Sequence, residues 1–149
     1  MPNEASEEAG FTLIELLVVI VIMGLTAALL LARGPVRSTG LETRAAAAEV
    51  AQTFRLGRSR AIANDRAVLV VLDLPSHRLV MDGIARPPLP VWLPLTARMA
   101  DGAAPRRAIF SFAPDGSATG GTIALGAPGR RILVGVDWLT GRIDVANAR

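Results

Sequence analysis

The pattern of apolar and polar positions divides the chain into two parts of different character. From Phe11 to Ala32 the chain runs for 22 residues with a single formal charge, at Glu15. As a helix, a run of that length would be about 33 Å long, which is enough to cross a hydrocarbon core of about 30 Å. The pattern therefore predicts a membrane-spanning helix over residues 11–32.

A second helical pattern follows an expected break. Arg33-Gly34-Pro35 predicts a bend or an end of the helix, because proline lacks an amide donor and glycine adds backbone freedom. Helical spacing then resumes near Gly40 and continues to Asn64, and residues 33–66 are expected to be the second half of the long N-terminal helix. The apolar positions of this second pattern are Ala47, Val50, Ala51, Phe54, Ala61 and Ile62. Because Arg44, Arg55 and Arg58 lie largely off that face, we expect the apolar stripe to pack on a sheet.

From Ala67 onward the pattern is typical of strands. The runs 67–74 and 78–81 are separated by Pro75-Ser76-His77, which predicts a hairpin. Residues 85–105 contain five prolines, so we expect an irregular loop with one short extended piece at 91–93. Four further strands are predicted at Ala108–Ala113, Thr122–Leu125, Arg131–Val136 and Arg142–Val145. Since turns and not helices separate these strands, residues 67–149 predict an antiparallel sheet domain and the whole chain an α+β fold.

Composition narrows the possibilities. Beyond residues 1–32, the 149-residue chain has room for one small domain of about 115 residues. The aromatic fraction of 4% and the absence of tyrosine predict an aliphatic core, and the absence of cysteine excludes disulfides and thiolate chemistry. All 16 basic residues are arginines, and the net charge is +3. Because the arginines are scattered along the chain, we expect them to lie separately on the solvated surface. The alternative is that they form a basic surface that binds nucleic acid, anionic lipid or an acidic protein.

The residues around Glu15 carry a resemblance to a known family. Gly10-Phe11-Thr12-Leu13-Ile14-Glu15-Leu16 resembles the processing site of type IV pilins and type II secretion pseudopilins. The resemblance implies that residues 1–10 are a leader peptide, that a prepilin peptidase/N-methyltransferase cuts between Gly10 and Phe11, and that the new amine of Phe11 is methylated. It also implies that the Glu15 carboxylate pairs with the N-terminal amine of a neighbouring subunit. The alternative is a plain signal anchor with a chance glutamate.

The rest of the chain extends the resemblance. Four pieces occur in order behind the processing site: Arg58–Ile62, Phe112–Gly116, Gly120-Gly121 and Thr140–Arg142. Together they resemble the domain shared by the H-type minor pseudopilins of type II secretion and the fimbrial T-type minor pilins. The resemblance implies a pilin-like α+β fold, in which a long N-terminal helix packs on an antiparallel β-sheet domain.

The resemblance also implies a function. It points to a minor pseudopilin of the type II secretion pseudopilus, which assists the export of folded proteins across the outer membrane. The chain would be a single-pass protein of the bacterial inner membrane with a periplasmic C-terminal domain, and its partners would be other minor and major pseudopilins. The alternative is a fimbrial T-like minor type IV pilin involved in pilus assembly or DNA uptake. Receptors of that kind carry a basic C-terminal tail, whereas this chain has Asp144 there, so we expect no nucleic-acid partner.

Signals for catalysis, metal or cofactor binding are weak. His77 is the single histidine, it lies in an expected turn, and no cysteine can share a metal with it. No nucleophile elbow and no phosphate-binding loop occur, so we expect neither an enzyme nor a cofactor. Trp92 and Trp138 are interpreted as core or half-buried sheet residues, or alternatively as interface anchors. Arg106-Arg107 and Arg130-Arg131 are the candidates for a basic patch.

Overall fold

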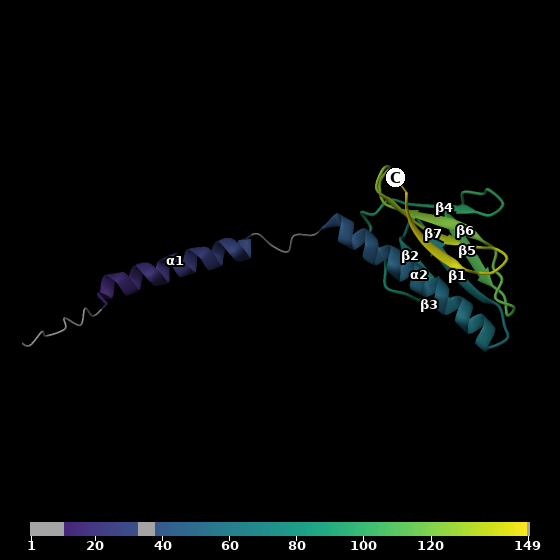
Figure 1. The fold of residues 1–149 in the computed structure, drawn as a ribbon, viewed down its shortest axis with the longest axis horizontal. Coiled ribbons are helices and arrows are strands. Elements are labelled where there is room, and N and C mark those ends of the chain that lie inside the picture. Colours follow the sequence, from purple (N-terminus) through teal and green to yellow (C-terminus); the bar gives the residue numbers. More distant parts are fainter. Residues whose placement is uncertain (1–10, 33–37, 149) are drawn as a thin grey trace, which may run out of the picture. The chain divides into compact units, whose positions relative to one another are not determined.

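The computed structural model describes residues 11–32 and 38–148 and divides the chain into two compact units, Met1–Arg37 and Ser38–Arg149. The first unit contains helix α1, Leu13–Ala32 (Figure 1). Within the described residues, no helix combines the length and the hydropathy that a membrane crossing requires. The break expected at Arg33-Gly34-Pro35 lies outside the described residues.

Helix α2, Thr39–Ala63, belongs to the second unit and presents the predicted apolar stripe to the sheets. Five of the six stripe positions are buried: Ala47, Val50, Ala51, Phe54 and Ala61. The sixth, Ile62, lies in the last turn of the helix and is 46% exposed. Its Cδ1 lies near the turn at Gly116. The helix ends where Asp65 adopts a φ of 47° and the amide of Arg66 donates to the carbonyl of Ala61, a bond that terminates helices.

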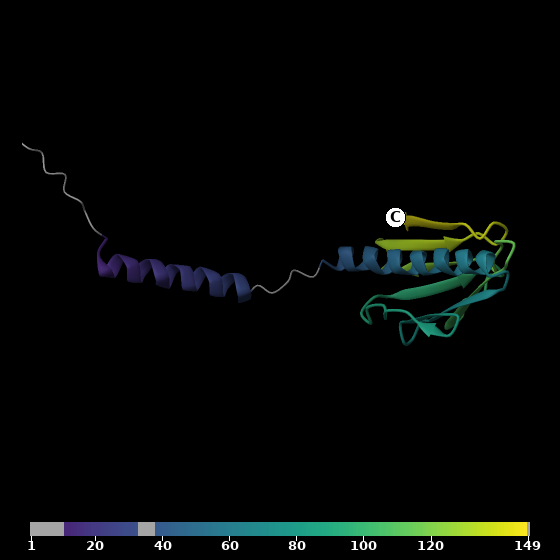
Figure 2. The same ribbon diagram turned by 90° about the horizontal axis from the view of Figure 1, so that it is seen from below.

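Two four-stranded antiparallel sheets complete the second unit. Strands β1 to β4 are Val68–Asp73, Arg78–Met81, Ile84–Ala85 and Leu95–Met99, and strands β5 to β8 are Arg107–Phe112, Gly121–Leu125, Arg131–Val136 and Ile143–Ala148. One sheet has the order β3-β2-β1-β5 and the other the order β4-β6-β7-β8. Helix α2 packs chiefly on β1 of the first sheet and on β7 and β8 of the second, so it closes the core between them (Figure 2).

The predicted hairpin is confirmed, because β1 and β2 pair antiparallel from Val70↔Met81 to Asp73↔Arg78. The prediction for residues 85–105 is wrong in one respect: the strand in this segment is β4, Leu95–Met99, and residues 91–93 form no strand. The last proline before β4 is Pro94, so all its residues keep the amide donors that pairing with β6 needs.

The core is aliphatic around three phenylalanines. Phe54 of α2 lies between Phe110 and Phe112 of β5, with ring centroids 4.6 Å and 6.0 Å away. All three side chains are fully buried. The buried apolar cluster runs from Ala46 to Ile143 and lies entirely within the second unit, so this unit carries its own core.

Gly57 sets the distance between α2 and the sheets, which generates a testable expectation. A Cβ at this position would lie 3.0 Å from Val70 Cγ2 and 3.3 Å from Phe112 Cδ2. We therefore expect Gly57→Val to lower the free energy of unfolding by about 1–3 kcal/mol through overpacking. Urea unfolding followed by tryptophan fluorescence measures the change. The matched control is Gly40→Val in the same helix. A Cβ there would have Ser38 Oγ as its nearest neighbour, at 3.9 Å, so we expect little change in stability. Equal effects of the two substitutions would contradict the close contact at Gly57.

Candidate functional site

At the start of α1, Glu15 is held by the neighbouring Thr12. Thr12 caps α1: its hydroxyl accepts the amide of Glu15 at 3.3 Å, and its carbonyl accepts the same amide at 3.1 Å. Glu15 thus lies in the first turn, where the helix dipole favours a carboxylate. Thr12-Leu13-Ile14-Glu15 has the sequence signature of a capping box, which the sequence-based predictions overlooked, and the bond from the Glu15 amide to the Thr12 hydroxyl is one of its two hydrogen bonds. Phe11 is described and 84% exposed, whereas the expected cleavage residue Gly10 lies outside the described residues.

The surface of α1 is apolar on every side. Every side chain described between Leu13 and Leu29 is exposed, and the large apolar ones are 48% to 83% accessible. Helices that are apolar all round are found inside proteins, in assemblies or in membranes, because water disfavours so much uncovered apolar surface. The segment is therefore suited to an apolar environment or to a partner that covers it.

A second arrangement joins three motifs that are far apart in the sequence. Arg58, in the penultimate turn of α2, donates through Nε to the carbonyl of Gly116 at 3.2 Å and to the carbonyl of Thr140 at 3.1 Å. These three residues belong to the pieces Arg58–Ile62, Phe112–Gly116 and Thr140–Arg142 that carried the family resemblance. The structure brings the pieces together, and Arg58, Gly116, Thr140 and Gly141 are called the Arg58 joint below.

Glycine is required on both sides of the Arg58 joint. Gly116 and Gly141 have φ values of 87° and 59°, a region that favours glycine. A Cβ on Gly141 would collide with the carbonyl oxygen of Gly116, and one on Gly116 would lie 3.1 Å from the Arg58 guanidinium. The two turns therefore approach backbone to backbone, and the guanidinium satisfies the carbonyls that this approach would otherwise leave without a donor.

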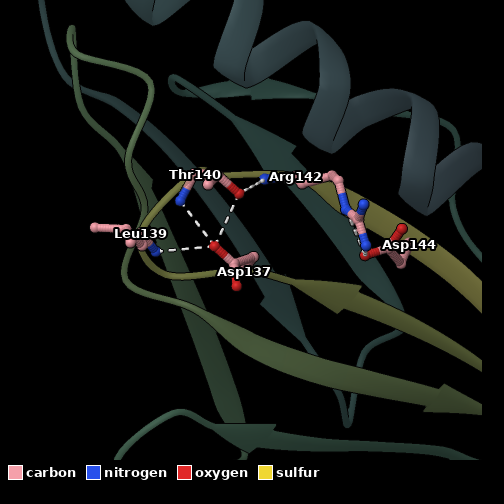
Figure 3. A network of polar contacts seen from close by, with 5 residues as sticks. All are labelled: Asp137, Leu139, Thr140, Arg142 and Asp144. Atoms are coloured by element: carbon pink, nitrogen blue, oxygen red, sulfur yellow. Dashed lines mark hydrogen bonds and ion pairs between the residues drawn. The ribbon is translucent and has the colours of Figure 1, made fainter.

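The C-terminal turn next to the Arg58 joint is held by a small polar network (Figure 3). Asp137 Oδ1 accepts the amides of Leu139 and Thr140 at 3.1 Å and 2.8 Å, and the Thr140 hydroxyl at 2.8 Å. The Thr140 hydroxyl in turn accepts the amide of Arg142. Arg142 pairs with Asp144 at 3.0 Å, with both side chains more than half exposed. The positive charge of Arg142 is thus met by a carboxylate two residues away.

Both turns of the joint contain an aspartate whose charge is stabilised locally. The amide and the hydroxyl of Thr140 hold the pKa of Asp137 below its usual value. In the other turn, the hydroxyl and the amide of Ser117 lower the pKa of Asp115 in the same way. Each carboxylate accepts hydrogen bonds from its own turn. We therefore interpret Asp115 and Asp137 as residues that order the two turns, not as a pair of catalytic carboxylates.

The remaining candidates do not form a common site. Trp92 is 44% exposed in a turn and Trp138 is 62% exposed at the tip of the β7–β8 connection, so the prediction that they are core or half-buried sheet residues is wrong. His77 has a positive φ in the β1–β2 turn. Arg106 and the pair Arg130-Arg131 line separate depressions. Within residues 11–32 and 38–148, no group of His, Asp and Glu is placed to hold a metal ion.

Two matches to known sequences were found, one to the N-terminal segment and one to most of the chain. Residues 6–31 match the family described as the prokaryotic N-terminal methylation motif, a range that includes Gly10, Phe11 and Glu15. Over 137 residues the chain is 31% identical to the type II secretion system protein H of Xanthomonas campestris pv. campestris. That alignment covers 90% of this chain and 80% of the relative.

Comparison with solved structures supports the pilin-like fold. The minor pseudopilin EpsH from the type II secretion system of Vibrio cholerae superposes with a TM-score of 0.61 at 17% identity, over 75% of this chain and 99% of that one. The type IV minor pilin FimU of Pseudomonas aeruginosa superposes with a TM-score of 0.51 at 21% identity, over 70% of this chain and 88% of that one. The expected fold, a helix packed on antiparallel sheets, is therefore confirmed.

The contribution of the Arg58 joint to stability can be tested by substitution. Replacing Arg58 by alanine removes the hydrogen bonds to the part-buried carbonyl of Gly116 and to the exposed carbonyl of Thr140, which we expect to lower the free energy of unfolding by about 1–3 kcal/mol. Urea unfolding measures the change. Arg55→Ala, an exposed arginine of the same helix that makes no ion pair among the described residues, is the control and should change stability by less than about 0.5 kcal/mol. If the two substitutions cost the same, Arg58 does not hold the turns together.

Proposed function

Because the chain belongs to the family of the type II secretion system protein H, whose role is that of a minor pseudopilin, we propose that it is processed between Gly10 and Phe11 and built into the pseudopilus near its tip. There it would assist the export of folded proteins across the outer membrane. Its partners would be the other minor and major pseudopilins, together with the prepilin peptidase/N-methyltransferase that cuts and methylates it. One observation carries the proposal: a methylation motif at residues 6–31 lies within a chain that aligns with protein H over 90% of its length.

The proposal includes insertion in the inner membrane through residues 11–32, with the second unit in the periplasm. Its support is the run of 22 residues with one charge, together with the exposed apolar surface of α1. Residues 1–10 contain three glutamates and no basic residue, whereas Arg33 and Arg37 follow the apolar run. Charge alone would favour the opposite orientation, so the proposed orientation rests on the family.

Glu15 is the residue on which assembly would depend. Cleavage after Gly10 would leave an ammonium on Phe11, about one helical turn from the Glu15 carboxylate. In an apolar surrounding, an unpaired carboxylate costs several kcal/mol, whereas a carboxylate paired with an ammonium costs far less. We propose that Glu15 of an incoming subunit pairs with the N-terminal amine of its neighbour. The pair neutralises both charges as the subunit leaves the membrane and fixes the position of the incoming helix relative to its neighbour.

The alternative function is that of a fimbrial T-like minor type IV pilin. The fold likeness to FimU is compatible with either role. A DNA receptor of that kind would need a free basic tail, but Arg142 is held by Asp144. The sequence relative that covers most of the chain is a secretion protein, which favours the pseudopilus.

Processing between Gly10 and Phe11 can be tested by substitution. Gly10→Val places a branched side chain at the cleavage position, and we expect the residues 1–10 to remain attached. Intact-mass spectrometry of the chain purified from its native membrane reads the result directly. The parent chain should begin at Phe11 and carry a methyl group. A parent chain that still begins at Met1 would sink the proposal.

The role of Glu15 in assembly can be tested in the same way. Glu15→Gln keeps the shape of the side chain but removes the charge that pairs with the amine, so we expect incorporation into sheared pseudopili to fall about tenfold or more while the chain remains in the membrane fraction. Immunoblots of the two fractions measure this. Glu42→Gln, which removes a carboxylate from the first turn of α2, is the matched control and should assemble normally. Undiminished incorporation of the Glu15 variant would contradict the pairing.

A further inference from the structure

A groove runs along one side of α2, between this helix and β8. Its central depression has a volume of about 300 Å³ and an apolar floor that includes Ala48, Ala51 and Val145. A second depression of about 470 Å³ adjoins it at Arg44 and reaches Arg130 and Arg131. A third, of about 480 Å³, adjoins it at Arg55 and reaches Ile143. The three depressions together are called the α2–β8 groove.

One wall of the α2–β8 groove is the edge of a sheet. Strand β8 lies at the end of the order β4-β6-β7-β8 and pairs with β7 alone. Its centre is open to solvent: the four residues from Asp144 to Asn147 are exposed, and Val145 is 48% accessible. An edge strand offers backbone donors and acceptors to another extended chain, and such strands are commonly protected by prolines or bulges. Strand β8, Ile143–Ala148, contains no proline.

The charge along the α2–β8 groove is of one sign. Arg44, Arg55 and Arg130 line it and are exposed. In the part of the chain that the structure describes, the ion pairs are Arg66–Asp82, Arg86–Glu49 and Arg142–Asp144, so none of these three arginines has a carboxylate partner. The one acid of β8, Asp144, is already held by Arg142. The groove therefore combines an apolar floor with positive charge that nothing in the described chain neutralises.

We propose that the α2–β8 groove binds an acidic, extended segment of another protein, which adds to β8 as a further strand. Arg44 and Arg55 are eleven residues apart on α2, which corresponds to about 16 Å along the helix. In an extended chain, residues on the same face are about 7 Å apart, so carboxylates four to six residues apart would reach both arginines. Backbone pairing supplies the affinity, and the two arginines select acidic side chains.

The shape and lining of the groove favour a polypeptide over a nucleic acid. None of the residues that line the three depressions is aromatic, so there is no platform on which bases could stack. Alanines and Val145 form an apolar floor that suits alternate side chains of a strand, not a phosphate backbone. This inference goes beyond the proposed place in a pseudopilus, since it concerns a surface that processing and the pairing of Glu15 do not use.

The experiment uses the full chain purified in detergent and a fluorescein-labelled peptide of about ten residues, called the Glu-Val-Glu peptide. One face of its strand carries two glutamates four residues apart with a valine midway between them, and the other face carries threonines. Fluorescence anisotropy at moderate salt measures the dissociation constant. We expect Arg44→Gln combined with Arg55→Gln to weaken binding about tenfold, because two charge-assisted contacts are lost. The matched control combines Arg98→Gln with Arg107→Gln, two exposed arginines on β4 and β5 outside the groove, and should bind within about twofold of the parent. Circular dichroism confirms that both double variants fold.

Two further probes distinguish the mode of binding. A peptide of the same sequence with N-methyl groups on alternate amides keeps the charge but cannot pair along an edge, so we expect it to bind at least about tenfold more weakly. A duplex DNA of similar charge should compete poorly. The proposal is overturned if the parent chain does not bind the Glu-Val-Glu peptide, if both double variants lose affinity equally, or if the N-methylated peptide binds as tightly as the unmethylated one. Tighter binding of the DNA with the same dependence on Arg44 and Arg55 would replace it by a nucleic-acid site.

Discussion

The close contact between α2 and the two sheets is the constraint on which the second unit depends. Small residues make it possible: Ala47 and Ala51 are almost fully buried, and a methyl group on Gly57 would lie only 3.0 Å from Val70 Cγ2. Because the helix approaches this closely, Phe54 can reach between Phe110 and Phe112 and close a core that has few aromatic side chains. The same contact places Arg58 within reach of two turns that belong to different parts of the chain.

Sequence reasoning found the elements whose signal is local. The apolar stripe of α2 was predicted from helical spacing, and β1, β5 and β7 were predicted within a few residues as short runs bounded by turns. Strand β4 was overlooked because its neighbourhood is rich in proline, and only its pairing with β6 makes it a strand. Trp138 was interpreted as a core or half-buried sheet residue, with an interface anchor as the alternative, and it lies at an exposed tip. Pairing partners and tips are determined by the tertiary arrangement, which periodicity does not encode.

The candidate site shows the same division. Phe11 and Glu15 were singled out because the residues around them resemble a prepilin processing site, and their roles in processing and pairing are proposals. The Arg58 joint could not be foreseen as a unit. Its three pieces were recognised as a resemblance, but their common role appears only when Gly116 and Gly141 are seen to touch through their backbones. The arginines of the α2–β8 groove looked dispersed along the chain because two come from a helix and one from a turn of a sheet.

The Arg58 joint has a role in the architecture of the second unit and shows no feature that would select a partner. A guanidinium that ties a helix to two glycine turns preserves the packing of the fold, whatever the surface around it does. These motifs therefore support the packing of this chain and leave the partner open. The side chains that could distinguish partners lie outside the joint: Arg142 has its charge met by Asp144, whereas Arg44 and Arg55 have theirs exposed over an apolar floor. A shared fold with different surface charge is the physical basis on which related subunits can select different neighbours.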